Sequence, residues 1–309
     1  MFSYTFATID VPGSSITSAN GMNNSGQIVG SYADSAGHTH GFLDTRGSFS
    51  TINVPGATST SANGINNFGD IVGNFVDNKG MEHGFLDHHG HFTNIDAPGA
   101  TTYFGIANGT SANGINDNGQ IVGSYWGPTN GPPHPDGTKD GIAEHAFVDS
   151  HCRFASIGTP QNYGAEGIAF FSATGINNHG QIVGNTTTAP AGSTYGWVDT
   201  HGTLTPISRG FLDAPANGIN NNGQVVGSVS TLGSDQLGYV DTNGTVTTIN
   251  VPGSSHSSAS GINDFGRIVG NSSQGAFLAT PLTTGNVLGP TAPAFLLRHP
   301  PVAPAPQQL

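Results

Sequence analysis

Two dipeptides place a glutamate directly before a histidine, Glu82-His83 and Glu144-His145. The chain has only three glutamates, and the third is Glu166. Two carboxylates about 5–10 Å apart can hydrolyse a glycosidic bond, and a histidine can serve as the base of a β-elimination. If the protein is an enzyme, we therefore predict that its catalytic residues are Glu82, Glu144, Glu166 and His145.

The residues near these dipeptides also suit the binding of a sugar without catalysis. Flat aromatic rings stack on the apolar face of a sugar, and carboxylates, amides and cations form hydrogen bonds with its hydroxyl groups. Such residues stand out in a chain that is rich in Gly, Asn, Ser and Thr. The predicted ligand-binding residues are Lys79, His83, Tyr103, Phe104, Trp126, His134, Asp136, Lys139, Asp140 and Tyr163.

A ten-residue phrase that recurs six times indicates which elements must position these residues. The copies begin at residues 21, 64, 114, 175, 218 and 261, and the first reads GMNNSGQIVG. Three of the five intervals are 43 residues long, and a period of this size predicts an array of supersecondary units. In the first unit, turn residues separate four predicted strands at 18–23, 27–32, 41–44 and 49–54.

The two ends of the repeat array complement each other. The last unit runs into Pro281 before a fourth strand, and residues 6–13 resemble a fourth strand with no unit before them. A ring whose first strand joins the last blade avoids an exposed edge, whereas a β-helix needs no complementary half-units. We therefore predict an all-β fold, a six-bladed β-propeller of four-stranded blades over residues 1–282. A flexible Pro- and Ala-rich tail follows at 283–309.

Departures from the 43-residue period indicate where the function lies. Intervals of 50 and 61 residues flank the third copy, because three connections on blades 3 and 4 are longer than their counterparts. In up-and-down blades these connections share one face. All three glutamates and both lysines, Lys79 and Lys139, are assigned to such connections of blades 2–4. Long loops in compact domains are usually functional, which predicts a binding face; the alternative is that the charges only keep these loops soluble.

Other repeated residues are expected to serve the scaffold. His40, His83 and His145 begin the third strand of successive blades, where they either share a metal ion or bond within their own blade, and we predict the second. Turn chemistry explains the aspartates and asparagine pairs near the hairpins. No metal site and no cofactor are predicted, with Ca²⁺ or another divalent ion as the alternative. Cys152, the only cysteine, is expected to be a buried or half-buried spectator.

The composition excludes several classes of protein. The formal net charge of −12 opposes binding to a phosphate backbone. No run of 18 apolar residues predicts a membrane span, and the first residues lack the basic and apolar segments of an export signal. A single cysteine allows no internal disulfide. We expect a monomer with no nucleic-acid partner.

The start of the third strand carries a motif that resembles a known family. A histidine, a small residue and a phenylalanine follow the decapeptide in three blades: His40-Gly41-Phe42, His83-Gly84-Phe85 and His145-Ala146-Phe147. This pattern resembles the bacterial HAF family of probable extracellular repeats, over residues 1 to about 281. The other three blades have Tyr195, Leu237 and Gly275 in place of the histidine. The resemblance implies an extracellular or cell-surface location.

These features together predict a ligand-binding propeller that recognises carbohydrate or another cell-envelope polymer through the loops of blades 2–4. The alternative is a carbohydrate-active enzyme, either a polysaccharide lyase or a glycoside hydrolase, that uses the carboxylates and histidine of the same face. A structural or protein-interaction scaffold is the second alternative, because propellers support many unrelated functions.

Overall fold

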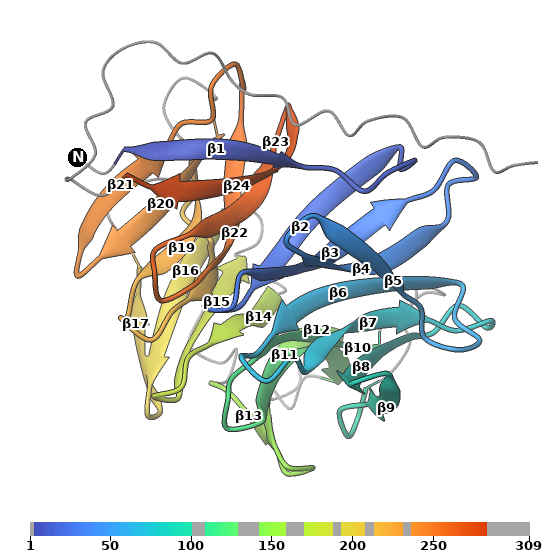
Figure 1. Ribbon diagram of the computed structural model, residues 1–309. Helices are drawn as coiled ribbons and strands as arrows, with labels where there is room; N and C mark the ends of the chain where they lie inside the picture. Colours follow the sequence, from blue (N-terminus) through green and yellow to red (C-terminus); the bar gives the residue numbers. More distant parts are fainter. Residues whose placement is uncertain are drawn as a thin grey trace, which may run out of the picture.

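The computed structural model of the protein describes residues 3–100, 109–128, 142–158, 170–187, 193–207, 213–230 and 236–282. Within these ranges the chain forms six four-stranded sheets and no helix. The sheets are arranged as blades around a common axis (Figure 1). The predicted six-bladed β-propeller is therefore confirmed. Among the described residues there is no helix long and apolar enough to span a membrane.

Each blade contains four antiparallel strands, A to D from the axis outward. Blade 1 comprises β2 (Ile16–Met22), β3 (Gln27–Ala33), β4 (Thr39–Thr45) and β5 (Ser48–Ile52). Blade 2 comprises β6 (Ser59–Ile65), β7 (Ile71–Val76), β8 (Glu82–His88) and β9 (His91–Ile95). Blade 3 comprises β10 (Thr110–Ile115), β11 (Gln120–Pro128), β12 (Ile142–Ser150) and β13 (Phe154–Ser156).

The remaining blades repeat this pattern. Blade 4 comprises β14 (Phe170–Ile176), β15 (Gln181–Thr187), β16 (Thr194–Thr200) and β17 (Thr203–Pro206). Blade 5 comprises β18 (Ala216–Ile219), β19 (Val225–Ser230), β20 (Gln236–Thr242) and β21 (Thr245–Ile249). Blade 6 comprises β22 (Ser257–Ile262), β23 (Ile268–Ser272), β24 (Gly275–Pro281) and β1 (Tyr4–Ile9). The strand predicted at 41–44 is longer than expected, because its pairing with β3 extends from Thr39 to Thr45.

The first strand closes the ring as predicted. β1 pairs antiparallel with β24, in a register that runs from Tyr4 opposite Pro281 to Ile9 opposite Ala276. It therefore takes the outer position of blade 6, which the last repeat leaves unfilled. Figure 1 shows this blue strand lying beside the red strands from the other end of the sequence. The predicted tail, 283–309, lies outside the described residues.

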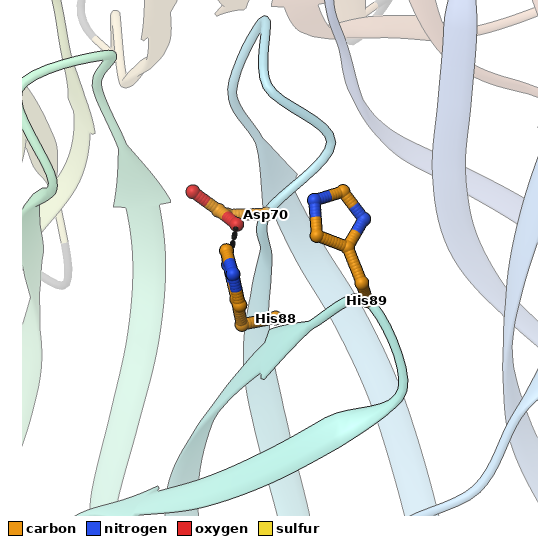
Figure 2. A group of neighbouring side chains, drawn as sticks. All are labelled: Asp70, His88 and His89. Carbon is orange, nitrogen blue, oxygen red and sulfur yellow. Dashed lines mark hydrogen bonds and ion pairs between the residues drawn. The ribbon is translucent and has the colours of Figure 1, made fainter.

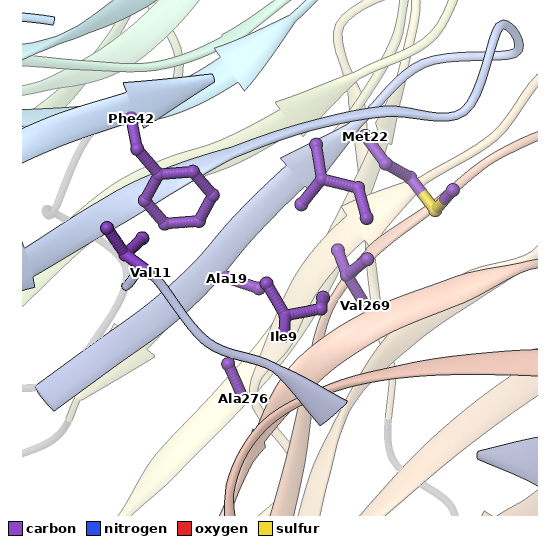
Figure 3. Packing of buried hydrophobic residues seen from close by; sticks show 8 residues of the cluster. Ile9, Val11, Ala19, Met22, Phe42, Val269 and Ala276 are labelled. Carbon is purple, nitrogen blue, oxygen red and sulfur yellow. The ribbon is translucent and has the colours of Figure 1, made fainter. Parts of the chain in front are cut away.

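Apolar side chains fill the space between neighbouring blades. Each C strand has one large aromatic residue that is buried: Phe42, Phe85, Phe147, Trp197, Tyr239 and Phe277. Figure 3 shows the cluster at the point of closure, where Ile9 and Val11 lie near Phe42 of blade 1 and Val269 and Ala276 of blade 6. Burial of one large apolar side chain contributes about 1.5–3 kcal/mol. Apolar packing therefore supports the closure that the β1–β24 pairing makes.

A glycine in each B strand allows the C-strand aromatic ring to lie against the backbone. In blade 3, a Cβ on Gly123 would come within 2.0 Å of the Ser111 carbonyl oxygen and 2.9 Å of the Phe147 ring. The equivalent positions are Gly30, Gly73, Gly184, Gly227 and Gly270. The glycine that ends each decapeptide is therefore required by close packing.

A closed ring of asparagine side chains joins the six A–B hairpins. Each first asparagine of the decapeptide donates from its Nδ2 to the backbone carbonyl of the equivalent asparagine in the next blade, over 3.0–3.4 Å. The residues are Asn23, Asn66, Asn116, Asn177, Asn220 and Asn263, all buried. Each also accepts a backbone N–H of its own turn, as predicted. The bonds between blades were not predicted, because they link residues about one repeat apart.

The second residue of each pair forms another closed ring. Its backbone N–H donates to the side-chain oxygen of the equivalent residue in the next blade over 2.7–2.9 Å. Four of these residues are asparagines, whereas blades 3 and 6 have Asp117 and Asp264. Asp117 accepts the side-chain amides of both neighbours, Asn67 and Asn178. Asp264 accepts those of Asn24 and Asn221. The two carboxylates thus each satisfy two amides across blade boundaries.

The C–D turns confirm one prediction and correct another. The carboxylates of Asp44, Asp87 and Asp241 accept the backbone N–H three residues later, as turn chemistry predicts. Cys152 is exposed, so the prediction of a buried or half-buried thiol is wrong. It is exposed because it lies within the C–D turn of blade 3, with a left-handed φ of +66°. The equivalent residue of blade 2 is Gly90, with φ +90°.

Candidate functional site

A polar cavity of about 270 Å³ lies where blades 2, 3 and 4 meet. Its lining residues are Glu82, Gly109, Ser111, Asn113, Ser124, Trp126, Glu144 and Ser172. Glu82 begins β8 and pairs with Val76 at the end of β7 that is far from the A–B turn. The cavity therefore lies toward the B–C and D–A end of the blades, the end where sequence analysis predicted the binding face.

Strands, and not loops, position both glutamates of the cavity. Glu82 is the first residue of β8, and Glu144 lies within β12. Their assignment to connecting loops is therefore wrong. In blade 3, β11 and β12 each extend to nine residues, so part of the apparent insertion lengthens this hairpin. A side chain on a paired strand is held more rigidly than one on a loop, which favours a preformed site.

The register of the β11–β12 hairpin groups three of the cavity residues. Trp126 lies directly opposite Glu144. Ser124 precedes Trp126 by two residues, so the pleat places it on the same face of the sheet. The Ser124 side chain is hydrogen-bonded to the Glu144 carboxylate. Ser124 was not predicted, although the two-residue alternation along a strand is a signal that could have identified it.

Burial raises the pKa of both carboxyl groups in the cavity. Burial raises the pKa of Glu82, and the nearby negative charge of Glu144 raises it further. The amide Nδ2 of Asn74 donates to Glu82 Oε1 over 2.7 Å, which acts in the opposite direction. Burial also raises the pKa of Glu144, against the effect of the hydrogen bond with Ser124. Two carboxylates with raised pKa values in one cavity are typical of a functional site.

Trp126 forms the aromatic wall of the cavity. Its ring centroid lies 5.5 Å from that of Phe170, with an interplanar angle of 74°. Its backbone N–H donates to the Gly109 carbonyl over 3.1 Å. A Cβ on Gly109 would come within 1.7 Å of the Glu82 carbonyl oxygen. Gly109 therefore brings blades 2 and 3 close enough for Glu82 and Trp126 to line the same cavity.

Hydrogen bonds within and between blades support the polar lining. Asn63 donates to the Asn74 side chain over 3.0 Å, and Asn74 in turn donates to Glu82. Ser111 donates to Asn113 over 2.9 Å, and Asn113 donates to the Ala173 carbonyl of blade 4 over 2.8 Å. Four lining residues were not predicted, because they resemble the background of the repeat: Gly109, Ser111, Asn113 and Ser172.

The predicted histidines that the structure describes, His83 and His145, do not line this cavity. His83 Nδ1 lies 2.8 Å from Asp96 Oδ1, and its ring stacks on Phe75. His145 Nε2 lies 3.3 Å from the Gly127 carbonyl oxygen, and its ring stacks on Tyr125.

His40 contacts partners in its own blade as well. Its Nδ1 lies 2.9 Å from Asn53 Oδ1, and its ring lies against Tyr32. All three histidines therefore have polar partners within their own blade, as predicted. The three do not come together in any metal-ligand group found among the described residues.

The other predicted site residues fall into two groups. Lys79 lies in the B–C turn of blade 2, where its backbone N–H donates to Asp77, and it does not line the cavity. The rest lie outside the described residues: Tyr103, Phe104, His134, Asp136, Lys139, Asp140, Tyr163 and Glu166. Of the predicted residues that the structure describes, Glu82, Glu144 and Trp126 come together.

Comparisons with known proteins identify the fold and no family. No protein-family model and no curated protein matches the sequence, so the resemblance to HAF repeats stays a prediction. A structure of AofleA from Arthrobotrys oligospora is 12% identical, with a TM-score of 0.51, over 92% of this chain and 87% of that one.

Two further structures match with lower TM-scores. A lectin from Aleuria aurantia, described as a six-bladed β-propeller with a novel fucose recognition mode, is 10% identical, with a TM-score of 0.44, over 92% of this chain and 100% of that one. The β-propeller domain of the Trilobed protease from Pyrococcus furiosus is 10% identical, with a TM-score of 0.46, over 87% and 98%. Such likenesses extend to the fold alone, so the function has to be argued from the cavity.

Proposed function

We propose that the protein is a carbohydrate-binding propeller and that the cavity between blades 2, 3 and 4 holds the sugar. The observation that carries this proposal is the convergence of one indole ring and two carboxylates on a small polar cavity. An indole offers a flat apolar surface to a pyranose ring, and a hydrogen bond to a charged group contributes about 1.5–3 kcal/mol. The serine hydroxyl groups add donors and acceptors around them.

The charge of the cavity favours a neutral sugar over an acidic one. The carboxylates of Glu82 and Glu144 repel any further negative charge that enters the cavity. The raised pKa of Glu82 indicates this repulsion. A uronic acid would bring a third carboxylate into the same low-dielectric space, at a cost that increases as water is displaced. The volume of about 270 Å³ lies just below the usual range for ligand sites, which suits a small ligand of one or two sugar units.

Glycan binding by the full chain tests this proposal. Trp126→Ala and Glu144→Gln should each weaken the binding of a neutral glycan by at least about tenfold, because each removes a contact worth roughly 1.4 kcal/mol or more. Phe265→Ala is the matched control, since Phe265 is an aromatic residue that is 67% exposed in the A–B turn of blade 6. Unchanged affinity in the first two variants, or equal loss in the control, would contradict the proposed site.

A glycoside hydrolase is the second candidate function, favoured by the convergence of Glu82 and Glu144 on one cavity, where the charge of Glu144 raises the pKa of Glu82. One carboxylate with a raised pKa can act as the acid while the other acts as base or nucleophile. Release of reducing ends from a panel of neutral polysaccharides would support this candidate if Glu82→Gln and Glu144→Gln both abolish it. If the wild type binds the glycan without releasing reducing ends, and both variants lose this binding, the result would support sugar binding without catalysis.

We also propose an extracellular or cell-surface setting and a cell-envelope polymer as the source of the sugar. This extension rests on the resemblance of the repeats to the HAF family. Cell fractionation of the native host with an antibody to the chain would test it. Recovery from the medium or the cell surface would support this setting, and recovery from the cytosol would contradict it.

A further inference from the structure

Asp70, His88 and His89 form a compact group at the hairpin end of blade 2, the end away from the cavity. Asp70 follows the A–B turn, His88 ends β8, and His89 lies in the C–D turn. One donor atom from each of the three residues lies within 4.8 Å of those from the other two. Figure 2 shows the three side chains gathered between the two turns. This is the only such group found among the described residues.

The surroundings hold this group in place. Asp70 Oδ2 accepts the side-chain amide of Asn66 over 2.9 Å, so the carboxylate is tied to the buried asparagine ring. Asp70 Oδ1 faces His88 Nδ1 at 2.5 Å. His89 adopts a left-handed φ of +53°, which places its ring beside Gly69 of the A–B turn. Two of the three ligand atoms are therefore already adjacent, and the third residue leans toward the same turn.

Comparison between blades indicates that this group is not part of the repeat. Where blade 2 has Asp70 and His88, blades 3, 4 and 5 have a glutamine whose Nε2 donates to a serine or threonine hydroxyl over 3.1–3.4 Å. The pairs are Gln120 with Ser150, Gln181 with Thr200, and Gln224 with Thr242. Blade 2 thus exchanges both partners of one neutral pair for a carboxylate and an imidazole.

We propose that Asp70, His88 and His89 bind a divalent transition-metal ion such as Zn²⁺. Two imidazole nitrogens and one carboxylate oxygen are ligands that Zn²⁺, Co²⁺, Ni²⁺ and Cu²⁺ accept, whereas Ca²⁺ and Mg²⁺ prefer oxygen alone. Three protein ligands leave one position of a tetrahedral ion for water or a further ligand. The ion would bind the imidazole nitrogens in their neutral form and the carboxylate in its ionised form.

A bound ion would connect the A–B and C–D turns of blade 2. A ligand that binds only the folded chain raises its stability in proportion to the logarithm of ligand concentration over Kd. The site therefore acts as a clamp on the hairpin end, independently of the proposed sugar site at the other end. Failure of either proposal leaves the other unaffected, because their residues do not overlap.

Calorimetric titration of the untagged, chelator-treated full chain with Zn²⁺ tests the site. The wild type should bind one equivalent, and its melting temperature should rise. The variant D70Q/H88T restores the pair found in blades 4 and 5, so it should fold normally and bind Zn²⁺ at least about a hundredfold more weakly. H91A is the matched control, because His91 is exposed next to the same turn but is not part of the group. Its affinity should match that of the wild type.

A constructive variant sharpens the test. Blade 3 already has His151 at the position of His89, with φ +56° and its ring beside Gly119. Q120D/S150H should therefore create a second site, so that the stoichiometry rises from one to two. The proposal is overturned if the wild type binds no stoichiometric Zn²⁺, if D70Q/H88T keeps wild-type affinity, or if a folded Q120D/S150H protein still binds one equivalent.

Discussion

Polar side chains have different surroundings at the two ends of the propeller. At the hairpin end, buried asparagines donate to one another around a closed ring, and the same bond occurs in all six blades. At the other end, between blades 2 and 4, Glu82 and Glu144 are drawn into a cavity where burial raises the pKa of both. The symmetric end satisfies its polar groups within the protein, and the irregular end keeps hydrogen-bonding capacity for a ligand.

This difference teaches how to separate scaffold from site in a repeat protein. A buried polar group without a partner costs about 1–3 kcal/mol, so a repeated polar residue is expected to have a repeated partner. Asn113 combines both roles, because it donates to the Ala173 carbonyl of the next blade and also lines the cavity. Glu144 also has a partner, Ser124, but its carboxyl group is half-buried with a raised pKa, and this calls for a functional explanation.

The largest expected effect comes from breaking the asparagine ring. Asn116 donates to Gln120 and to the Asn177 carbonyl, and it accepts two backbone N–H groups. Asn116→Ala should therefore lower the free energy of unfolding by about 2–4 kcal/mol, since each lost bond costs about 0.5–1.5 kcal/mol. Equilibrium denaturation in urea measures this change.

Asn118→Ala provides the control for that measurement. Asn118 belongs to the same turn but is exposed, and its side chain makes one bond, to the Asn178 carbonyl. Its loss should change the free energy of unfolding by less than about 1 kcal/mol. Equal effects of the two substitutions would show that the ring is no more important than any other turn contact.

Glu144→Gln should have the opposite sign at neutral pH. Burial raises the pKa of Glu144 above its ordinary value of 4.5, so the contribution of this group to stability is present below pH 4.5 and is lost as pH rises through the folded-state pKa. The neutral glutamine avoids this loss. We expect a gain on the order of 1 kcal/mol at pH 7, as is common when a residue kept for function is replaced.

The pH dependence of this gain separates charge from packing. Urea denaturation of both proteins at pH 7 and pH 4 should give a difference in free energy of unfolding that shrinks at the lower pH. A difference that is the same at both pH values would exclude the buried charge as its cause.

Cys152→Gly should stabilise the C–D turn of blade 3, because it places a glycine at a position with a left-handed φ. A left-handed φ costs a residue with a Cβ roughly 1–2 kcal/mol, and glycine avoids this cost but loses more backbone freedom on folding. We expect a net gain of about 0.5–1 kcal/mol in thermal or urea denaturation. Cys152→Ser keeps the Cβ and should change little, so a gain in this control would point to the thiol instead of the backbone.

The smallest expected effect is the pH dependence of the stability that Asp117 contributes at the hairpin end. Burial alone would raise its pKa, but hydrogen bonds from Asn67 and Asn178 outweigh it, and the pKa falls below the ordinary 3.8. Its contribution to stability is therefore present above pH 3.8 and is lost as pH falls through the folded-state pKa. The stability difference between the wild type and Asp117→Asn should shrink in acid by about 0.2–1 kcal/mol, since the group is partly exposed. A difference independent of pH would contradict a role for the charge.

Much of the fold could be predicted, because it is encoded at short range. The Asn and Gly residues of each decapeptide predict a hairpin by their turn chemistry alone, and the half-units at the two ends predict the β1–β24 pairing. The site was predicted only in part. Glu82, Glu144 and Trp126 were identified because they depart from the repeat, whereas Ser111, Asn113 and Ser172 are indistinguishable from scaffold residues in sequence.

The sequence by itself determined the number of blades, the closure of the ring and the sector that departs from symmetry, because all three follow from the spacing of the repeated phrase. Only the tertiary structure decided that Glu82 and Glu144 share one cavity, that the histidines turn toward partners in their own blades, and that Asp70 meets His88. The physical reason is that burial, charge coupling and ligand geometry depend on side chains from separate strands and blades. The distances between these side chains depend on how the sheets pack around the axis, and they cannot be read from the spacing of residues along the chain.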